Sequence, residues 1–395
     1  MKQKNTCPLC ESNRLTNLYE VDVPLLQNRV YESRDAAIGS GKGNMVLTRC
    51  GDCGFAFNAA FDENAIVYDE NYDNSVPSKL FQDYYEQIVD YFYEKYRLKN
   101  EYVYDIGCGK GTFLKLLCKK YTDVNGIGID PSYEGDTQPS ANLRFINDFF
   151  KTEHVTEKPA LLISRHVFEH IEYPVSFLNI IQEPLKRFQD IPVFIEVPDF
   201  EWIVKNETFW DICYEHCNYF SPYPLQQLFT AAAIRLNAIT PAFGLQYLWV
   251  EGVINPSQKS QNNLEGLPFL QVNRVEQFIK NIELAKSHVK EVLAMYKTNS
   301  VKIAIWGMAT KGVIFSNRID PRREIIDYCI DINETKQNKY IPGTGHQIHA
   351  PSILENLHEK VVVIIMNGNY IKEIKQEALN YCRNCTFIDA HGNSI

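Results

Sequence analysis

An acidic and a basic side chain are neighbours in the stretch Tyr214–Ser221, which reads YEHCNYFS. The neutral imidazole of His216 could take a proton from a weakly acidic substrate, and the adjacent Glu215 could orient the ring and stabilise its cation. Taken alone, the stretch is better explained by a structural histidine near a strand-to-helix turn. The rings of Tyr219 and Phe220 are predicted to pack in the core. Whether the stretch does chemistry therefore depends on the elements that surround it.

Two pairs of cysteines could hold a metal ion: Cys7 with Cys10, and Cys50 with Cys53. Each C-x-x-C turn directs two thiolates at one position, and two such turns complete the tetrahedral site that zinc prefers. Because thiolates fill all four positions, we predict a structural Zn²⁺. The long separation of the pairs requires an insertion between them. Four unrelated buried thiols are the alternative.

A glycine-rich loop follows the apolar strand predicted over residues 102–106. The strand carries Asp105 near its end, Gly107, Gly109 and Gly111 follow at alternate positions, and a helix begins near residue 113. A dinucleotide fingerprint would need a glycine where this chain has Thr112. The pattern instead resembles motif I of the class I S-adenosylmethionine methyltransferases. The resemblance implies that the loop faces the amino acid portion of that cofactor and that Asp105 attracts its ammonium group.

Polar side chains also follow the next three predicted strands. Asp130 ends the second strand and could accept hydrogen bonds from both ribose hydroxyls, whereas Asp148 and Phe149 follow the third strand and suit adenine. Arg165 follows the fourth strand. Open α/β sheets bind ligands at the carboxyl ends of their strands, so we predict an S-adenosylmethionine site here. The alternative is an α/β domain that kept the turn and lost the ligand.

Composition limits the classes of protein that fit. The 395 residues are 45% hydrophobic, and the formal net charge of −9 disfavours nonspecific nucleic-acid binding. We expect no transmembrane run and no secretory signal, and therefore a cytoplasmic protein without a membrane partner, as a monomer or small homo-oligomer. Cysteines in that compartment favour metal binding over disulfides, so Cys382 and Cys385 are predicted to be ordinary core or surface thiols.

The chain divides into four predicted regions. Residues 1–62 form a zinc-binding domain, residues 63–98 a helical connector with a helix over 79–99, residues 99–254 a Rossmann-like methyltransferase domain, and residues 255–395 a second α/β domain. The second α/β domain begins with a polar linker, NPSQKSQNNLEG, and continues with a helix over 272–296. The apolar face of that helix is predicted to contain Val275, Phe278, Ile279, Ile282, Leu284, Val289, Val292 and Leu293.

This order of domains resembles the sugar C-methyltransferases, which act on nucleotide-linked 4-keto sugars in deoxysugar biosynthesis. Besides the cysteine pairs and the glycine loop, three stretches carry the resemblance. They are Glu215–His216 with the following YFS, the turn Trp306–Gly312, and the run Ile326–Thr344 with its D-x-N-x-x-K-Q-x-x-Y-x-P-G-T pattern.

The resemblance implies a mechanism and its residues. A ketone acidifies the neighbouring C–H, a base removes the proton, and the enolate attacks the methyl group of S-adenosylmethionine. His216 becomes the base, Glu215 its partner, His170 a group that handles the enolate oxygen, and Tyr72 an N-terminal active-site tyrosine. The family tyrosine three positions before the histidine corresponds to Cys213 in this chain. Tyr214, one residue later, is the remaining catalytic candidate.

The C-terminal domain is expected to contact the nucleotide. Gly307, Lys311 and Gly312 would bind the diphosphate, and Asp331 would accept a ribose hydroxyl. The same stretch adds the candidates Asn333, Gln337 and Tyr340. The alternative is a domain that only closes the cleft.

Carbon methylation of a nucleotide-linked keto-deoxysugar is the leading prediction. Two alternatives stay open at this point: an O- or N-methyltransferase on a related glycan or small-molecule precursor, and a noncatalytic zinc protein that binds S-adenosylmethionine or a nucleotide. The displaced tyrosine supports the first of these alternatives.

Overall fold

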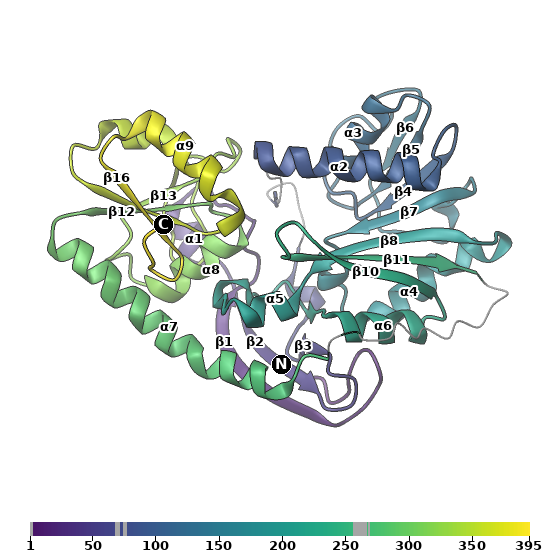
Figure 1. Ribbon diagram of the computed structural model, residues 1–395, viewed down its shortest axis with the longest axis horizontal. Helices are drawn as coiled ribbons and strands as arrows, with labels where there is room; N and C mark the ends of the chain where they lie inside the picture. The colour runs from purple at the N-terminus through teal and green to yellow at the C-terminus, as the bar shows by residue number, and fades with distance from the viewer. Residues whose placement is uncertain (1–2, 68–71, 74–76, 256–266, 268) are drawn as a thin grey trace.

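The computed structural model describes residues 3–67, 72–73, 77–255, 267 and 269–395, whose strands form three separate sheets (Figure 1). The central sheet and the C-terminal sheet form the two lobes seen in Figure 1, and the N-terminal sheet lies beneath and between them. The predicted linker falls outside the described residues except for Asn255.

The N-terminal sheet has the order β1-β2-β3-β9. Its first three strands are β1 (Leu15–Pro24), β2 (Lys42–Cys50) and β3 (Ala56–Asn58), with α1 (Arg34–Ile38) before β2. The insertion between the cysteine pairs is therefore β1, α1 and most of β2. The fourth strand, β9 (Asn218–Tyr219), comes from the middle of the chain and pairs antiparallel with β3. This pairing ties the residues directly after His216 to the N-terminal domain.

The central sheet has the order β10-β11-β8-β7-β4-β5-β6, with β10 and β11 antiparallel at one edge. Its parallel strands are β4 (Tyr102–Ile106), β5 (Asn125–Ile129), β6 (Leu143–Ile146), β7 (Pro159–Arg165) and β8 (Ile191–Pro198), and the edge strands are β10 (Arg235–Ala242) and β11 (Tyr247–Ile254). The predicted Rossmann-like central domain is confirmed, because the first strand along the chain lies in the middle and strand order reverses beside it.

Helices cover both faces of the central sheet (Figure 1). On one face α2 (Lys79–Tyr96) packs with α3 (Thr112–Lys120), and on the other lie α4 (Pro174–Gln182) and α6 (Pro222–Ala231). The helix predicted in the connector is thus present, and it packs on the central domain: Phe81, Tyr84, Ile88, Val89 and Phe92 are buried there.

The C-terminal sheet is parallel throughout, in the order β14-β13-β12-β15-β16. Its elements are β12 (Lys302–Trp306), α8 (Thr310–Ile319), β13 (Tyr328–Ile330), β14 (Ile348–His349), β15 (Val361–Ile365), α9 (Ile371–Tyr381) and β16 (Cys385–Asp389). The long α7 (Val272–Thr298) precedes them and buries Val275, Phe278, Ile282, Val289 and Leu293. Leu284, predicted on the same face, is 70% exposed because two residues at about 100° each turn it away from Ile282.

Cys382 and Cys385 are joined by a disulfide, so the prediction of two ordinary thiols was wrong. The first cysteine directly follows α9 and the second begins β16, and this tight connection holds their Cα atoms 5.8 Å apart. That separation is within the normal range for a disulfide. The sequence context alone gave no sign of the geometry.

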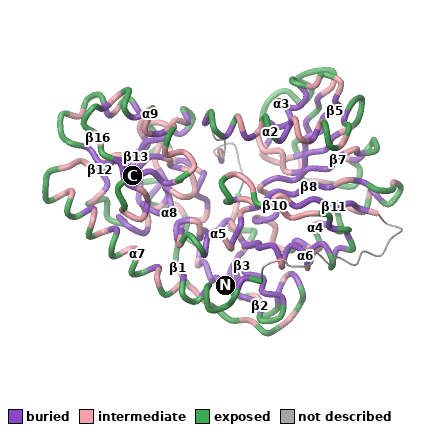
Figure 2. The backbone as a smooth tube through the Cα atoms, viewed as in Figure 1, coloured by how far each residue is buried: buried purple, intermediate pink, exposed green. Residues whose placement is uncertain are grey.

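The segment from 199 to 221, which contains α5 (Phe200–Lys205), leaves the central sheet and packs against the other two domains. Phe209 stacks on Phe315 of α8, and both belong to one hydrophobic cluster with Val23 of β1. Figure 2 shows buried backbone in the strands of both lobes and exposed residues along the outer side of α7. The Glu215–His216 pair therefore lies on a segment that all three domains hold in place.

Polar contacts close the junction between the two lobes. Glu373 of α9 caps the start of α2, since its carboxylate accepts hydrogen bonds from the Ser78 hydroxyl at 2.9 Å and the Leu80 amide at 3.0 Å. Gln246 of the central domain donates to Asn367 of the C-terminal domain at 2.8 Å. These contacts fix the position of the C-terminal domain relative to the central sheet.

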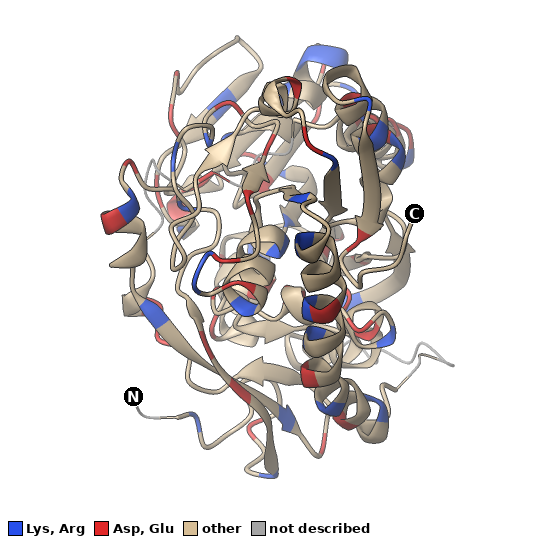
Figure 3. Cartoon of the chain, turned by 90° about the vertical axis from the view of Figure 1, so that its left-hand side faces the viewer, with Lys and Arg blue, Asp and Glu red and all other residues tan. Residues whose placement is uncertain are grey.

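In Figure 3, which views the molecule from the side of the C-terminal lobe, acidic and basic residues alternate along the chain without separating into regions of one charge. No helix within the described ranges combines the length and the apolar character needed to cross a membrane.

Candidate active site

The glycine loop after β4 adopts a backbone that favours glycine. Gly107, Gly109 and Gly111 have φ angles of 78°, 54° and 75°, in the left-handed region. A Cβ atom on Gly107 would lie 2.2 Å from a Val167 methyl carbon, and one on Gly111 would lie 2.5 Å from the Phe145 ring. The backbone of the loop therefore packs closely against its neighbours, and a side chain at Gly107 or Gly111 would displace it.

Asp105 carries a buried carboxylate beneath this loop. It is 3% exposed, and burial raises its pKa to about 7, although the charge of Arg165 opposes the rise. Among the described residues its carboxylate has no hydrogen-bond partner. A cationic ligand group would compensate this buried acid, which fits the predicted role toward an ammonium group.

Asp130 has a different environment. One oxygen accepts the Gly109 amide at 2.8 Å, and the other accepts the Ser132 amide at 2.7 Å and its hydroxyl at 2.6 Å. The carboxylate therefore clamps the glycine loop onto β5 and keeps only part of its accepting capacity for the predicted ribose contact.

The remaining cofactor candidates separate into exposed and buried residues. The Phe149 ring is 71% exposed, and the neighbouring Asp148 forms an ion pair with Lys151 at 2.5 Å. Arg165 is instead 8% exposed, with its guanidinium 4.4 Å from the Tyr85 ring and 4.6 Å from the Phe113 ring. The structure thus leaves Phe149 open to a ligand and places Arg165 inside the domain.

Glu215 is fully buried and holds two hydrogen bonds that come from the N-terminal part of the chain. One carboxylate oxygen accepts the Gln27 amide at 3.1 Å, and the other accepts the Tyr72 hydroxyl at 2.9 Å. Burial raises the pKa of Glu215, and these donors and the charge of His170 oppose the rise. The structure therefore places Tyr72, a predicted active-site residue, against Glu215, and it adds Gln27, for which the sequence held no signal.

His170 and His216 face each other. Their ring centroids are 4.9 Å apart with the planes nearly perpendicular, and His170 follows β7 in the short helix η3 (Phe168–His170). The Nδ1 of His170 donates to the Glu215 carbonyl oxygen at 3.0 Å, which orients the ring. Burial, together with the charge of His170, lowers the pKa of His216 to about 3. The His216 imidazole is therefore neutral near neutral pH and able to accept a proton.

The aromatic neighbours of this pair are structural. The Tyr214 hydroxyl accepts the Asp62 amide at 3.0 Å, and its ring lies 5.5 Å from Phe61. The Tyr219 hydroxyl contacts the backbone N and O of Cys213, each at 3.0 Å. The structure does not bring Tyr214 to the histidines. The prediction that Tyr219 and Phe220 are core residues is confirmed by exposures of 3% and 1%.

In the C-terminal domain the turn after β12 depends on glycine. Gly307 has a φ of 102°, and a Cβ atom on Gly312 would lie 2.1 Å from the Gly307 carbonyl oxygen. Lys311 forms an ion pair with Asp211, so its ammonium joins α8 to the 199–221 segment. The charge predicted to meet phosphate is thus already paired between domains.

The Ile326–Thr344 run folds around Asp331, the acid that begins its D-x-N-x-x-K-Q pattern. Asp331 accepts the Met308 amide at 2.7 Å and the Asn333 amide at 2.8 Å, and the Gln337 side chain donates to the Asp331 carbonyl at 3.0 Å. Tyr340 forms a backbone bridge to Tyr31. The Asn333 amide group donates to Asp73 at 3.0 Å, next to Tyr72. The run therefore supports the N-terminal residues that reach Glu215.

Two polar residues that were not predicted connect this run to the site. Lys336 is 2% exposed and donates to the Asn28 side chain at 3.1 Å, and Asn28 donates to the Thr310 hydroxyl at 3.1 Å. Asn28 directly follows Gln27, so a short N-terminal segment joins Glu215 to the C-terminal domain. Lys336 was visible in the D-x-N-x-x-K-Q pattern, whereas Asn28 had no signal.

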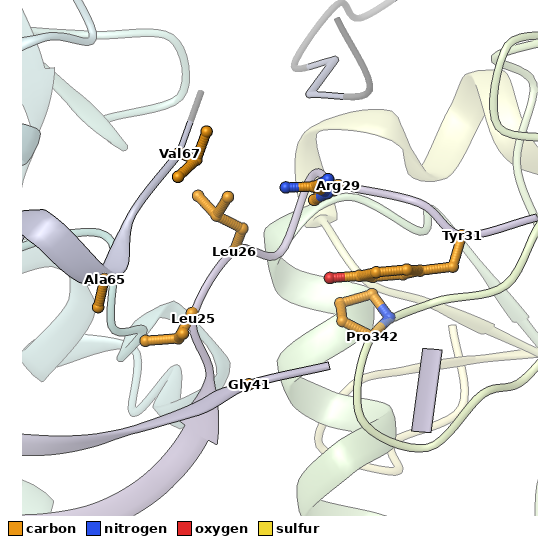
Figure 4. Close-up of a pocket in the computed structure, with 8 residues that line it drawn as sticks. All are labelled: Leu25, Leu26, Arg29, Tyr31, Gly41, Ala65, Val67 and Pro342. Atoms are coloured by element: carbon orange, nitrogen blue, oxygen red, sulfur yellow. The ribbon is translucent and has the colours of Figure 1, made fainter. Parts of the chain in front are cut away.

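A cavity of about 170 Å³ lies beside the same segment (Figure 4). Its lining consists of Leu25, Leu26, Arg29, Tyr31, Gly41, Ala65, Val67 and Pro342. In Figure 4 the Tyr31 hydroxyl and the Arg29 side chain extend toward the side of the cavity where the leucines lie. The cavity therefore joins apolar surface to polar side chains at the contact of the N- and C-terminal domains.

The four predicted metal cysteines form one cluster. Their sulfur atoms lie within 4.8 Å of one another, with 3.7 Å between Cys7 and Cys53 and 3.6 Å between Cys10 and Cys50. A tetrahedron with Zn–S bonds of about 2.3 Å has edges of about 3.8 Å, so the cluster could hold a zinc ion.

Comparison with known proteins matches two parts of the chain to family models. Residues 76–234 match a methyltransferase domain, and residues 261–388 match a C-methyltransferase C-terminal domain. The chain is also similar to the C-methyltransferase NovU of Streptomyces niveus, with 23% identity over 319 residues, 75% of this chain and 74% of that protein.

Solved structures resemble less than half of the chain. One is N,N-8-amino-8-demethyl-D-riboflavin dimethyltransferase from Streptomyces davawensis, with 14% identity, a TM-score of 0.33, and coverage of 44% of this chain and 55% of that one. Another is the plantazolicin methyltransferase in complex with a triazolic analogue and S-adenosylhomocysteine, with 15% identity, a TM-score of 0.36, and coverage of 46% and 86%.

Proposed function

We propose that this chain, which matches a methyltransferase domain and a C-methyltransferase C-terminal domain, methylates a carbon next to the ketone of a nucleotide-linked deoxysugar. The observation that carries the proposal is the neutral His216 imidazole, which faces His170 at the junction of the three domains. Removing a proton from a carbon acid requires a neutral base close to that carbon. A purely structural histidine would instead be expected to form hydrogen bonds with both of its ring nitrogens.

The central domain has side chains that suit S-adenosylmethionine. When bound, the cofactor supplies an electrophilic methyl group. The unpartnered carboxylate of Asp105 would hold its ammonium group, and the glycine loop would pass beneath its amino acid portion. Asp130 would contact the ribose with its remaining lone pair, and Asp148 with the exposed Phe149 ring would border the adenine.

The substrate proton would pass to His216. The C–H bond next to the ketone breaks, the proton binds a ring nitrogen of His216, and the electron pair moves toward the ketone oxygen as the enolate forms. Because Nδ1 of His170 is used by the Glu215 carbonyl, Nε2 can donate to that oxygen only when the His170 ring is protonated. A cation at this position would stabilise the charge that develops on the oxygen.

The nucleotide would lie against the C-terminal domain. The turn Gly307–Gly312 opens at the carboxyl end of β12, where parallel sheets bind ligands. Lys336 adds a buried positive charge, which favours the ionised form of Glu215. Asp331, Asn333, Gln337 and Tyr340 would then support the binding surface through their contacts with the backbone and with the Asp73 region.

Calorimetric titration of the purified protein with S-adenosylhomocysteine, followed by a series of nucleoside diphosphates, tests both binding sites. Mass spectrometry after incubation with S-adenosylmethionine and thymidine diphosphate 4-keto-6-deoxyglucose then tests the reaction. Carbon transfer removes the C–H next to the ketone, whereas oxygen transfer removes an exchangeable hydroxyl proton. A product that keeps that C–H and loses a hydroxyl would contradict the proposal.

We further propose that the four cysteines hold a structural Zn²⁺, and we expect Cys7→Ser to lose it. Structural zinc contributes several kcal/mol to folding. Loss of the metal should lower the midpoint of thermal unfolding, and it should also reduce activity because the sheet next to the cluster includes β9. Inductively coupled plasma mass spectrometry measures the metal. The control is Cys329→Ala, a buried thiol of the C-terminal core, which should keep one zinc per chain.

A further inference from the structure

We propose that Glu169, rather than Glu215, is the carboxylate that positions His216 and stabilises its protonated form. The inference rests on the proposed function, since it assigns a partner to the proposed base. Adjacency in the sequence favours Glu215 for this role, but the arrangement of side chains favours the residue before His170.

Glu169 lies against both histidines. One of its carboxylate oxygens and one ring nitrogen each of His170 and His216 lie within 4.8 Å of one another. Glu169 is 2% exposed, and its Oε2 atom has no hydrogen-bond partner among the described residues. Its Oε1 atom lies 3.5 Å from Nδ1 of His166. A buried carboxylate oxygen without a donor is costly, and a protonated imidazole would satisfy it.

The carboxylate of Glu215, unlike that of Glu169, has a hydrogen-bond donor at each oxygen. Both of its oxygens already accept hydrogen bonds, one from the Gln27 amide and one from the Tyr72 hydroxyl. These donors belong to the N-terminal part of the chain. Glu215 therefore anchors that segment to the site, and its backbone carbonyl, rather than its carboxylate, orients His170.

The groups around His216 change its pKa in opposite directions. Burial, His170, His166 and Lys311 all lower the pKa of His216, and Glu169 raises it. Without Glu169 the His216 imidazole would be a still weaker base. The carboxylate thus favours the cation that exists only after the substrate proton has been taken.

The proton balance assigns Glu169 a supporting role. The proton leaves the substrate carbon and binds His216, and the electron pair moves to the ketone oxygen. Glu169 stays ionised throughout and forms an ion pair with the new imidazolium, as a carboxylate does beside a catalytic histidine. The same three side chains could also be the ligands of a divalent cation, and the test distinguishes that case.

The measurement is solvent deuterium exchange into thymidine diphosphate 4-keto-6-deoxyglucose by the full-length, zinc-containing protein with S-adenosylhomocysteine bound. We expect Glu169→Gln to slow exchange by about 10²-fold or more, with unchanged affinity for S-adenosylhomocysteine and for the sugar nucleotide. Glu169→Asp should recover part of the rate. Formate should restore exchange to Glu169→Ala in a concentration-dependent way, because it can replace the missing carboxylate.

The matched control is Glu172→Gln, on the same loop, which forms an ion pair with Lys4 at 2.9 Å and should leave exchange unchanged. Normal exchange by Glu169→Gln, or loss of cofactor binding without formate rescue, would overturn the inference. Loss of a second bound metal in that variant would overturn it in favour of a metal site. Absence of exchange by the wild-type protein would instead overturn the proposed function, and the assignment of a partner to its base would fall with it.

Discussion

Replacing His216 with alanine should lower the rate of methyl transfer by about 10²- to 10⁴-fold, the usual contribution of a general base. The substrate carbon is a weak acid, and the His216 ring is the neutral base that the site places beside His170. Affinity for S-adenosylhomocysteine should not change, because the glycine loop and Asp105 lie on other elements. Single-turnover transfer of a labelled methyl group, with calorimetry of cofactor binding, measures both quantities.

Two comparisons make this result specific. His288→Ala removes an exposed imidazole from α7 and should leave the rate unchanged. Added imidazole should partly restore the rate of His216→Ala, because a small base can occupy the vacated space. Normal turnover by His216→Ala would show that another group takes the proton, and the assignment of the base would then be wrong.

Much of this site could be predicted because its signals are local. The strand Tyr102–Ile106 ends at its predicted residue, and the three glycines have the backbone angles that their spacing requires. The two cysteine turns likewise place all four sulfurs in one cluster. In each case a few consecutive residues determine the geometry, so the pattern along the chain is sufficient.

Contacts between distant residues could not be predicted in this way. The Gln27 amide binds Glu215 across 188 residues, and Lys336 donates to Asn28 across 308 residues. Lys311 was predicted to meet phosphate, but the fold supplies Asp211 as its partner. A sequence pattern identifies the face or the charge of a residue, and the packing of the three domains then selects its partner.

The same limit explains why Glu215 was predicted as the partner of His216. Neighbours in the sequence need not have side chains that face each other, and here the carboxylate is directed to Gln27 and Tyr72. Glu169 was present in the sequence beside His170, but only the approach of η3 to the 199–221 segment places it near His216. The candidate histidines could thus be identified from the sequence, and their carboxylate could not.

Replacing Asp105 with asparagine should weaken S-adenosylhomocysteine binding by about 10- to 150-fold, since a hydrogen bond to a charged group contributes roughly 1.5–3 kcal/mol. The variant should also change the pH dependence of binding. Burial raises the pKa of Asp105 to about 7, so the wild-type carboxyl is increasingly protonated below that pH. An ammonium ligand needs the ionised form. Wild-type affinity should therefore fall by up to about tenfold for each pH unit between 7 and 5, and Asp105→Asn should lack this fall.

The stability of the ligand-free protein should fall as the pH rises, whereas the affinity for the ligand should increase. The pKa of Asp105 is higher in the folded state than its ordinary value of 3.8, so its ionisation destabilises the fold as pH rises from about 4 through 7. Asp105→Asn removes this cost and should be at least as stable as the wild type at pH 8, as measured by thermal unfolding without ligand. Glu101→Gln, an exposed acid beside the opposite end of β4, should change neither property. Weakened binding together with lost stability would identify Asp105 as a structural residue, whereas weakened binding with retained stability would identify a group kept buried and charged for its ligand.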